Sequence, residues 1–126
     1  MPMKKYSEWP TNPRTRWVQA GNTFGRHLMD AAKEYAFDRI PKSIPAADRE
    51  IVQRAALDAI YGMMMLLDGV ADSEIDEAHR IEYVLLARVR EISESYDAIE
   101  EFELAPEGDG LCIGFHGWVE DDFGNT

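Results

Sequence analysis

The stretch IEYVLLARVREI, residues 81–92, decides the fold class of this chain, because its apolar residues fit two different periodicities. In an extended strand, alternate residues from Ile81 to Val89 share one face, while Arg88 and Arg90 lie on the other. In a helix, apolar residues at spacings of three and four also share a face. The β-branched and aromatic content favours the strand. We therefore predict a strand near 81–91 and retain a helix as the alternative.

Two further strands are predicted downstream, near 98–104 and 111–119. They flank the turn sequence Ala-Pro-Glu-Gly-Asp-Gly, across which Phe102 and Leu104 could pair with the second of these strands as a hairpin. A lone hairpin is marginally stable, whereas three strands packed on a helical layer are much more stable. The pattern therefore predicts a three-stranded antiparallel sheet.

Upstream of this region the apolar periodicity is helical. Asn12 and Pro13 are typical of a helix start. Pro41 disfavours helical backbone at the residue before it. Together these signals predict a first helix near 13–39.

A second helix is predicted near 46–68, with Asp68-Gly69 as its C-terminal stop. Between Ala55 and Leu67 its only ionisable residues are Asp58 and Tyr61. A helix that is apolar nearly all round is normally covered on several sides. We therefore expect Met63 and Leu66 to be buried, and we expect Asp58 to be buried with a polar partner.

These elements define an α+β fold, a helical hairpin packed on a three-stranded antiparallel sheet. A mostly α fold with a C-terminal β-hairpin is the alternative. A length of 126 residues is that of one domain, and we divide the chain into an N-terminal arm, 1–12, and a single α+β domain, 13–126. The start of the chain has no apolar run, so we expect no signal peptide. One cysteine suits a reducing cytosol, so we expect a cytoplasmic protein.

The net charge is concentrated in the last third of the chain. The formal charge is −11, and residues 91–126 contain eleven acidic residues but no lysine or arginine. Residues 1–90 contain thirteen acids and thirteen bases and are neutral. An acidic surface repels nucleic acids and anionic lipids and attracts basic proteins. We therefore expect no nucleic-acid or membrane partner, and we expect a cationic partner to dock on this third.

Three functional hypotheses follow. The first is a non-enzymatic protein-interaction domain that binds a basic partner. In size and acidity the chain resembles small immunity and inhibitor proteins that neutralise cationic toxins, a likeness of composition that covers no particular residue. The second is a small-molecule or metal-dependent enzyme with a pocket near His116 and Trp118. The third is a self-associating domain, a homodimer formed through its second helix.

The segment from Gly110 to Gly124 interleaves glycines with aromatic residues. On a strand, His116 and Trp118 would share a face beside Gly114, which indicates either a ligand recess near Gly114 and Gly117 or packing of Trp118 in the core. A Cys112–His116 dyad is excluded in a regular strand, where the two residues would lie ~13 Å apart. Our candidate binding residues share acidity or a place in this segment: Glu100, Glu101, His116, Trp118, Glu120, Asp121 and Asp122.

A carboxylate–histidine stripe of the kind that builds metal sites in bundles runs along the first predicted helix. Its members are His27, Asp30, Glu34 and Asp38. The second predicted helix offers no histidine to complete such a site. We therefore assign no metal ligand and expect no cofactor.

Overall fold

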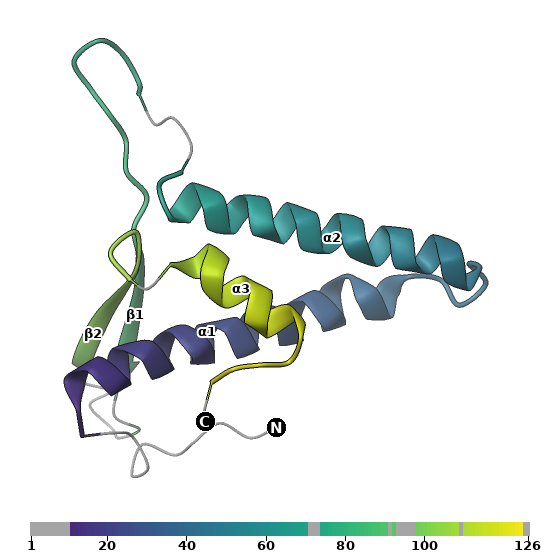
Figure 1. Ribbon diagram of the computed structural model, residues 1–126, viewed down its shortest axis with the longest axis horizontal. Helices are drawn as coiled ribbons and strands as arrows, with labels where there is room; N and C mark the ends of the chain where they lie inside the picture. The colour runs from purple at the N-terminus through teal and green to yellow at the C-terminus, as the bar shows by residue number, and fades with distance from the viewer. Residues whose placement is uncertain (1–10, 71–73, 91, 93–97, 109, 125–126) are drawn as a thin grey trace.

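The computed structural model describes residues 11–70, 74–90, 92, 98–108 and 110–124. Its elements, in chain order, are helix α1 (Pro13–Tyr35), the short 3₁₀ helix η2 (Phe37–Arg39), helix α2 (Ala46–Leu67), strands β1 (Leu85–Arg90) and β2 (Ala98–Ala105), and helix α3 (Leu111–Val119). In Figure 1, α1 and α2 diverge from the connection between them, and α3 lies in the opening. The predicted arm 1–12 lies, except for Thr11 and Asn12, outside the described residues.

The first helix begins as predicted, but its α-helical part ends at Tyr35 rather than near residue 39, and the short 3₁₀ helix η2 follows it. The Asn12 side chain accepts hydrogen bonds from the backbone N–H groups of Arg14 (2.9 Å) and Thr15 (3.2 Å), and Pro13 occupies the first turn. Ile40 has extended backbone before Pro41 (ψ 126°), so the chain leaves η2 where the proline requires it. These local signals are sufficient because each acts within a few residues.

The predicted second helix is confirmed as α2, but the expectation that it is covered on several sides is wrong. Met64 is its only buried residue in the described chain, whereas Met63 is 59% and Leu66 45% exposed. The reason is the arrangement in Figure 1: α1 diverges from α2, and among the described elements the nine-residue α3 makes the main packing contact along α2. Asp58 is likewise exposed rather than buried.

The predicted strand near 81–91 is confirmed for residues 85–90 and pairs antiparallel with β2, placing Leu85 opposite Ala105 and Arg88 opposite Glu101. Burial alternates along β1, with Leu85, Ala87 and Val89 turned inward. Residues 81–84 are not part of the strand. Pairing stops at Leu85 because its partner strand ends at Ala105 and the chain then turns towards α3.

The predicted strand at 111–119 is wrong, since these residues form α3. The described sheet is therefore two-stranded, and the fold is α+β with three α-helices. Leu111, Phe115 and Trp118 are the buried residues, at spacings of four and three, which is a helical face.

The start of α3 is stabilised from outside its own sequence. Asp68, the C-cap of α2, accepts hydrogen bonds from the backbone N–H groups of Leu111 (2.9 Å) and Cys112 (2.8 Å). A carboxylate at a helix N-terminus satisfies free N–H groups and interacts favourably with the helix dipole. This one side chain joins the end of α2 to the start of α3.

The core centres on Trp118, which is 4% exposed. Its ring lies directly over Gly25 of α1, where a Cβ atom would come within 2.2 Å of the indole. The indole Nε1–H donates to Asn22 Oδ1 (3.1 Å), and Phe24 packs edge-on at 6.0 Å between ring centroids. Because glycine alone leaves room for the ring, Gly25 determines how closely α3 approaches α1.

Among the described residues, no helix combines the length and the apolar character needed to cross a bilayer.

Candidate functional site

A cleft of about 570 Å³ lies between α2 and α3. Leu57, Tyr61 and Phe115 form its apolar floor, and Tyr61 lies 5.9 Å from the Phe115 ring centroid. The His116 ring lies at the edge, 5.4 Å from Tyr61. The helical spacing of α3 produces this arrangement, because Phe115 faces inward while His116 is exposed.

The edge of this cleft is predominantly acidic. Three exposed carboxylates line it, from Glu50, Asp58 and Glu120, against one guanidinium, from Arg54. A second cleft of about 600 Å³ between α1, α2 and the C-terminal segment is electrically balanced, with three cations and three anions: Arg26, Lys33, Arg49, Asp30, Asp38 and Asp121. Of these two clefts, therefore, the α2–α3 cleft has a net negative charge and the other is neutral.

The predicted recess shared by His116 and Trp118 is not formed. Two residues apart on a helix, the side chains point about 200° from each other, so that His116 is exposed in the cleft and Trp118 is buried against α1. Gly114 allows the indole to pack, since a Cβ there would come within 2.7 Å of the ring, whereas Gly117 lies against Asp122. The packing interpretation of this glycine-rich segment is the one that the geometry supports.

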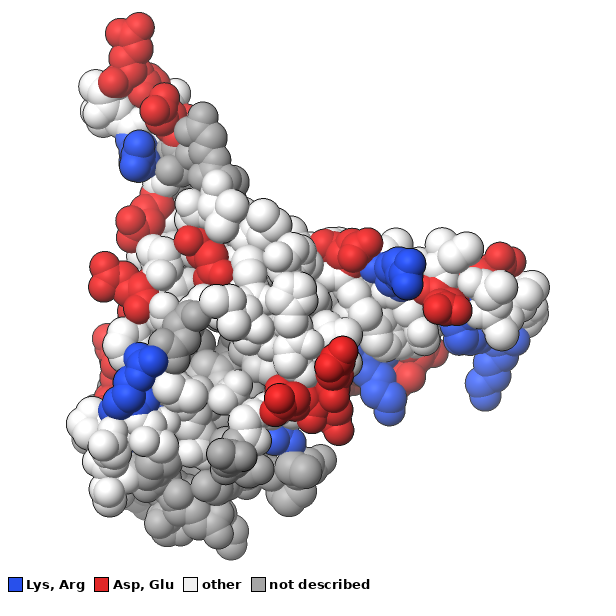
Figure 2. Space-filling model, viewed as in Figure 1, with Lys and Arg blue, Asp and Glu red and all other residues white. Residues whose placement is uncertain are grey.

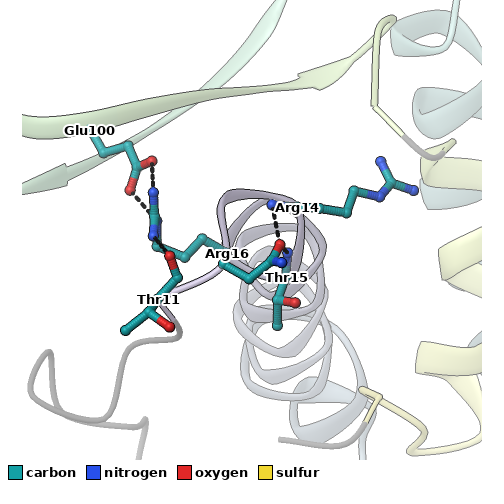
Figure 3. Close-up of polar contacts among 6 residues, drawn as sticks. Thr11, Arg14, Thr15, Arg16 and Glu100 are labelled. Atoms are coloured by element: carbon teal, nitrogen blue, oxygen red, sulfur yellow. Dashed lines mark hydrogen bonds and ion pairs between the residues drawn. The ribbon is translucent and has the colours of Figure 1, made fainter.

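Two predicted binding residues, Glu100 and Glu101, are engaged by arginines. Figure 3 shows Arg16 of α1 between Glu100 and the Thr11 carbonyl; its guanidinium donates to both Glu100 oxygens, at 2.8 and 3.0 Å. Glu101 pairs across the sheet with Arg88 at 2.7 Å. Glu100 thus ties β2 to the start of α1, and its charge is compensated.

The acids of the last third do not form one surface. Glu120, Asp121 and Asp122 are exposed directly after α3, while Glu100 and Glu101 lie on β2. Figure 2 shows acidic residues in several separate places on the face in view, with basic residues between some of them. Four of the eleven acids, Glu91, Glu94, Asp97 and Asp109, lie outside the described residues.

The chain reverses after α3 through a backbone turn at Asp121. Asp121 has a left-handed conformation (φ 64°), its N–H donates to the Trp118 carbonyl (3.0 Å), and the N–H of Asp122 donates to the Gly117 carbonyl (2.9 Å). This pair of bonds is a Schellman motif. It brings Phe123 back into the core and leaves the three acidic side chains outside.

No group of three or more histidine, cysteine or carboxylate side chains positioned to hold a metal ion is found within the described ranges. The stripe of His27, Asp30, Glu34 and Asp38 is exposed along α1 and η2.

Cys112 is a free cysteine at the start of α3. On a helix it lies one turn from His116, so the separation that we expected from a strand does not apply. Burial, followed by the hydrogen bond and the negative charge of Asp68, raises the pKa of the thiol from 9.0 to about 11, against the opposing effect of a hydrogen bond with Tyr61. The thiol is therefore protonated at neutral pH, which is unfavourable for a nucleophile.

We predict that alkylation of Cys112 by iodoacetamide near neutral pH is about 100-fold slower in the folded protein than in the urea-unfolded chain, the factor given by two pKa units. Because the pKa is raised in the folded state, this group also makes the free energy of unfolding fall as pH rises from 9.0 towards about 11. A Cys112→Ala variant should lack that decline. Equal alkylation rates in the folded and unfolded states would contradict the prediction.

Sequence reasoning missed Tyr61 and Glu50 as site residues and Asp68 as a cap. Tyr61 and Asp58 are three residues apart on α2, a spacing that places both on one helix face. That spacing was available in the sequence. The contribution of Phe115 and His116 was not, because it depends on α3 being a helix.

Searches against protein-family models, curated proteins and solved structures found no match to this chain.

Proposed function

We propose that this protein is a non-enzymatic interaction domain that binds a basic segment of a protein partner in the α2–α3 cleft. The observation that carries the proposal is the combination of an acidic edge, from Glu50, Asp58 and Glu120, with an apolar, partly aromatic floor. Lysine and arginine side chains have an apolar stem and a cationic head. The apolar floor of the cleft is complementary to the stem, and its acidic edge is complementary to the cationic head.

The aromatic floor adds specificity to the charge. The stem of a bound lysine or arginine packs on Leu57 and Phe115, and its cationic head lies close to Tyr61, whose ring face attracts cations. Asp121 and Asp122 follow directly after the cleft residue Glu120 and extend the negative charge along the approach to the site. Such edge charges chiefly increase the association rate.

Glu100 and Glu101 are not part of this proposed site, because each is paired with an arginine. An enzyme pocket beside both His116 and Trp118 is not proposed, since the two side chains lie on different sides of α3. The cytoplasmic location stays within the proposal, supported by the single free cysteine.

The test compares two triple variants that remove the same three charges. The cleft variant is Glu50→Gln, Asp58→Asn and Glu120→Gln, and the control is Glu34→Gln, Glu77→Gln and Glu82→Gln, all exposed residues outside the cleft. With an octalysine peptide as probe, we expect the cleft variant to bind about tenfold more weakly, given ~0.5 kcal/mol for each exposed charge pair. The control should bind less than about twofold more weakly.

Nuclear magnetic resonance shifts should locate the bound peptide at Tyr61, Phe115 and His116. Association should slow as salt increases, because charges beyond a Debye length of ~8 Å are screened at physiological ionic strength. Equal weakening in the two variants would mean that net charge, rather than the cleft, attracts the peptide, and would overturn the proposal.

A further inference from the structure

The outer face of α2 is apolar and exposed. Successive residues of an α-helix are about 100° apart around its axis, and seven residues of α2 fall within an arc of about 120°. Between Ile51 and Leu66, no charged residue falls within this arc. All seven are exposed: Ile51, Val52, Ala55, Ala59, Gly62, Met63 and Leu66. The charged side chains Arg54 and Asp58 lie outside the arc, towards the α2–α3 cleft. This face is therefore distinct from the proposed site.

We propose that a second copy of the chain covers this face, forming a two-fold dimer in which the two α2 helices cross antiparallel. A two-fold interface must be complementary to itself. Large residues stand at both ends of the face, with small ones between them. In an antiparallel pair, the Ile51 end of one helix meets the Leu66 end of the other, and the small residues allow close approach at the crossing.

The chemistry of the face excludes the basic partner of the cleft as its occupant. An uncharged apolar surface gives a cationic segment no counter-charge, whereas a second copy offers an equally uncharged surface. The inference therefore does not depend on the proposed function, and each can fail separately.

The area is that of a weak, reversible dimer. The 16 residues from Ile51 to Leu66 give a face about 24 Å long and about 10 Å wide, on the order of 350 Å² of curved surface in each protomer. Two such faces bury on the order of 700 Å², a size typical of weak, transient interfaces.

Sedimentation of the full chain should show a concentration-dependent mass between 14.3 kDa and twice that value, from about 1 μM to about 1 mM, the range expected for an interface of this size. The double variant Val52→Glu and Met63→Glu should raise the dissociation constant about tenfold or more, because carboxylates would be buried without partners. Both positions are exposed, so the fold should persist, and circular dichroism checks this. Ile75→Glu, at a residue 64% exposed outside the face, should leave the dimer unchanged.

Disulfide cross-linking tests the antiparallel arrangement. In a Cys112→Ser background, a mixture of the Val52→Cys and Met63→Cys variants should form a mixed disulfide, because residue 52 of one copy faces residue 63 of the other. Each variant alone should not form a disulfide-linked dimer, since like positions would lie about 16 Å apart, beyond the reach of a disulfide. Dimerisation of Val52→Cys alone would overturn the antiparallel arrangement, and a monomer at every concentration would overturn the dimer.

Discussion

Replacing Trp118 with alanine should lower the free energy of unfolding by about 3–5 kcal/mol, the range for truncating a large buried aromatic residue. The ring is 4% exposed and lies against Gly25 and Gly114, so its loss leaves a cavity where α3 meets α1. The substitution also leaves Asn22 without the indole N–H that it accepts from. With about 5–15 kcal/mol of total stability expected for a domain, this one change removes a large share.

Chemical denaturation followed by circular dichroism measures the effect. Val119→Ala, at a neighbouring residue that is 41% exposed, is the control and should change stability by less than about 1 kcal/mol. If Trp118→Ala does not fold, Trp118→Phe retains most of the ring and should show an intermediate loss. A Trp118→Ala variant with the stability of the parent would mean that the indole is not part of the core.

The elements predicted correctly are those whose signals are local. Asn12 caps α1 two residues before Arg14, and β1 is recognised by the β-branched and aromatic content of its segment, although it starts at Leu85 rather than near residue 81. An interaction within a few residues along the chain requires no knowledge of the rest of the fold. The same reasoning placed α2 at nearly its observed limits.

The error at α3 has a different origin. Three glycines within or before the helix and β-branched residues along it favour other structures locally. The interactions that stabilise α3 as a helix come from distant parts of the chain. Its N-terminal cap is Asp68, more than forty residues earlier, and its apolar face packs on Gly25 of α1. A helix held by distant partners cannot be identified from its own periodicity over nine residues.

The candidate site was predictable only in part for the same reason. His116 and Glu120, two of the candidate residues, line the same cleft, whereas Trp118 was grouped with His116 because a strand would place both on the same face. The last third of the chain does contain an excess of acidic residues. However, the charge of one of them, Glu100, is compensated by Arg16, a residue 84 positions earlier in the chain. Composition gives the number of acids and does not show which of them are compensated.

The two neighbouring methionines of α2, Met63 and Met64, test which face of that helix is buried. Met64→Ala should lower the free energy of unfolding by about 2–5 kcal/mol, because Met64 is 3% exposed and belongs to the core. Met63→Ala should change it by less than about 0.5 kcal/mol, because the side chain is 59% exposed. The residue type and the substitution are identical, so the difference reports burial alone.

Both methionine variants are best unfolded with urea at about 1 μM protein, where the proposed dimer contributes little stability. At higher concentration the Met63→Ala variant should become less stable than the parent, because the parent gains stability from association and the variant gains less. Equal losses for the two variants at low concentration would mean that α2 is rotated or covered on both sides. In that case the outer face would not be open to a second copy, and the dimer would fail together with this prediction.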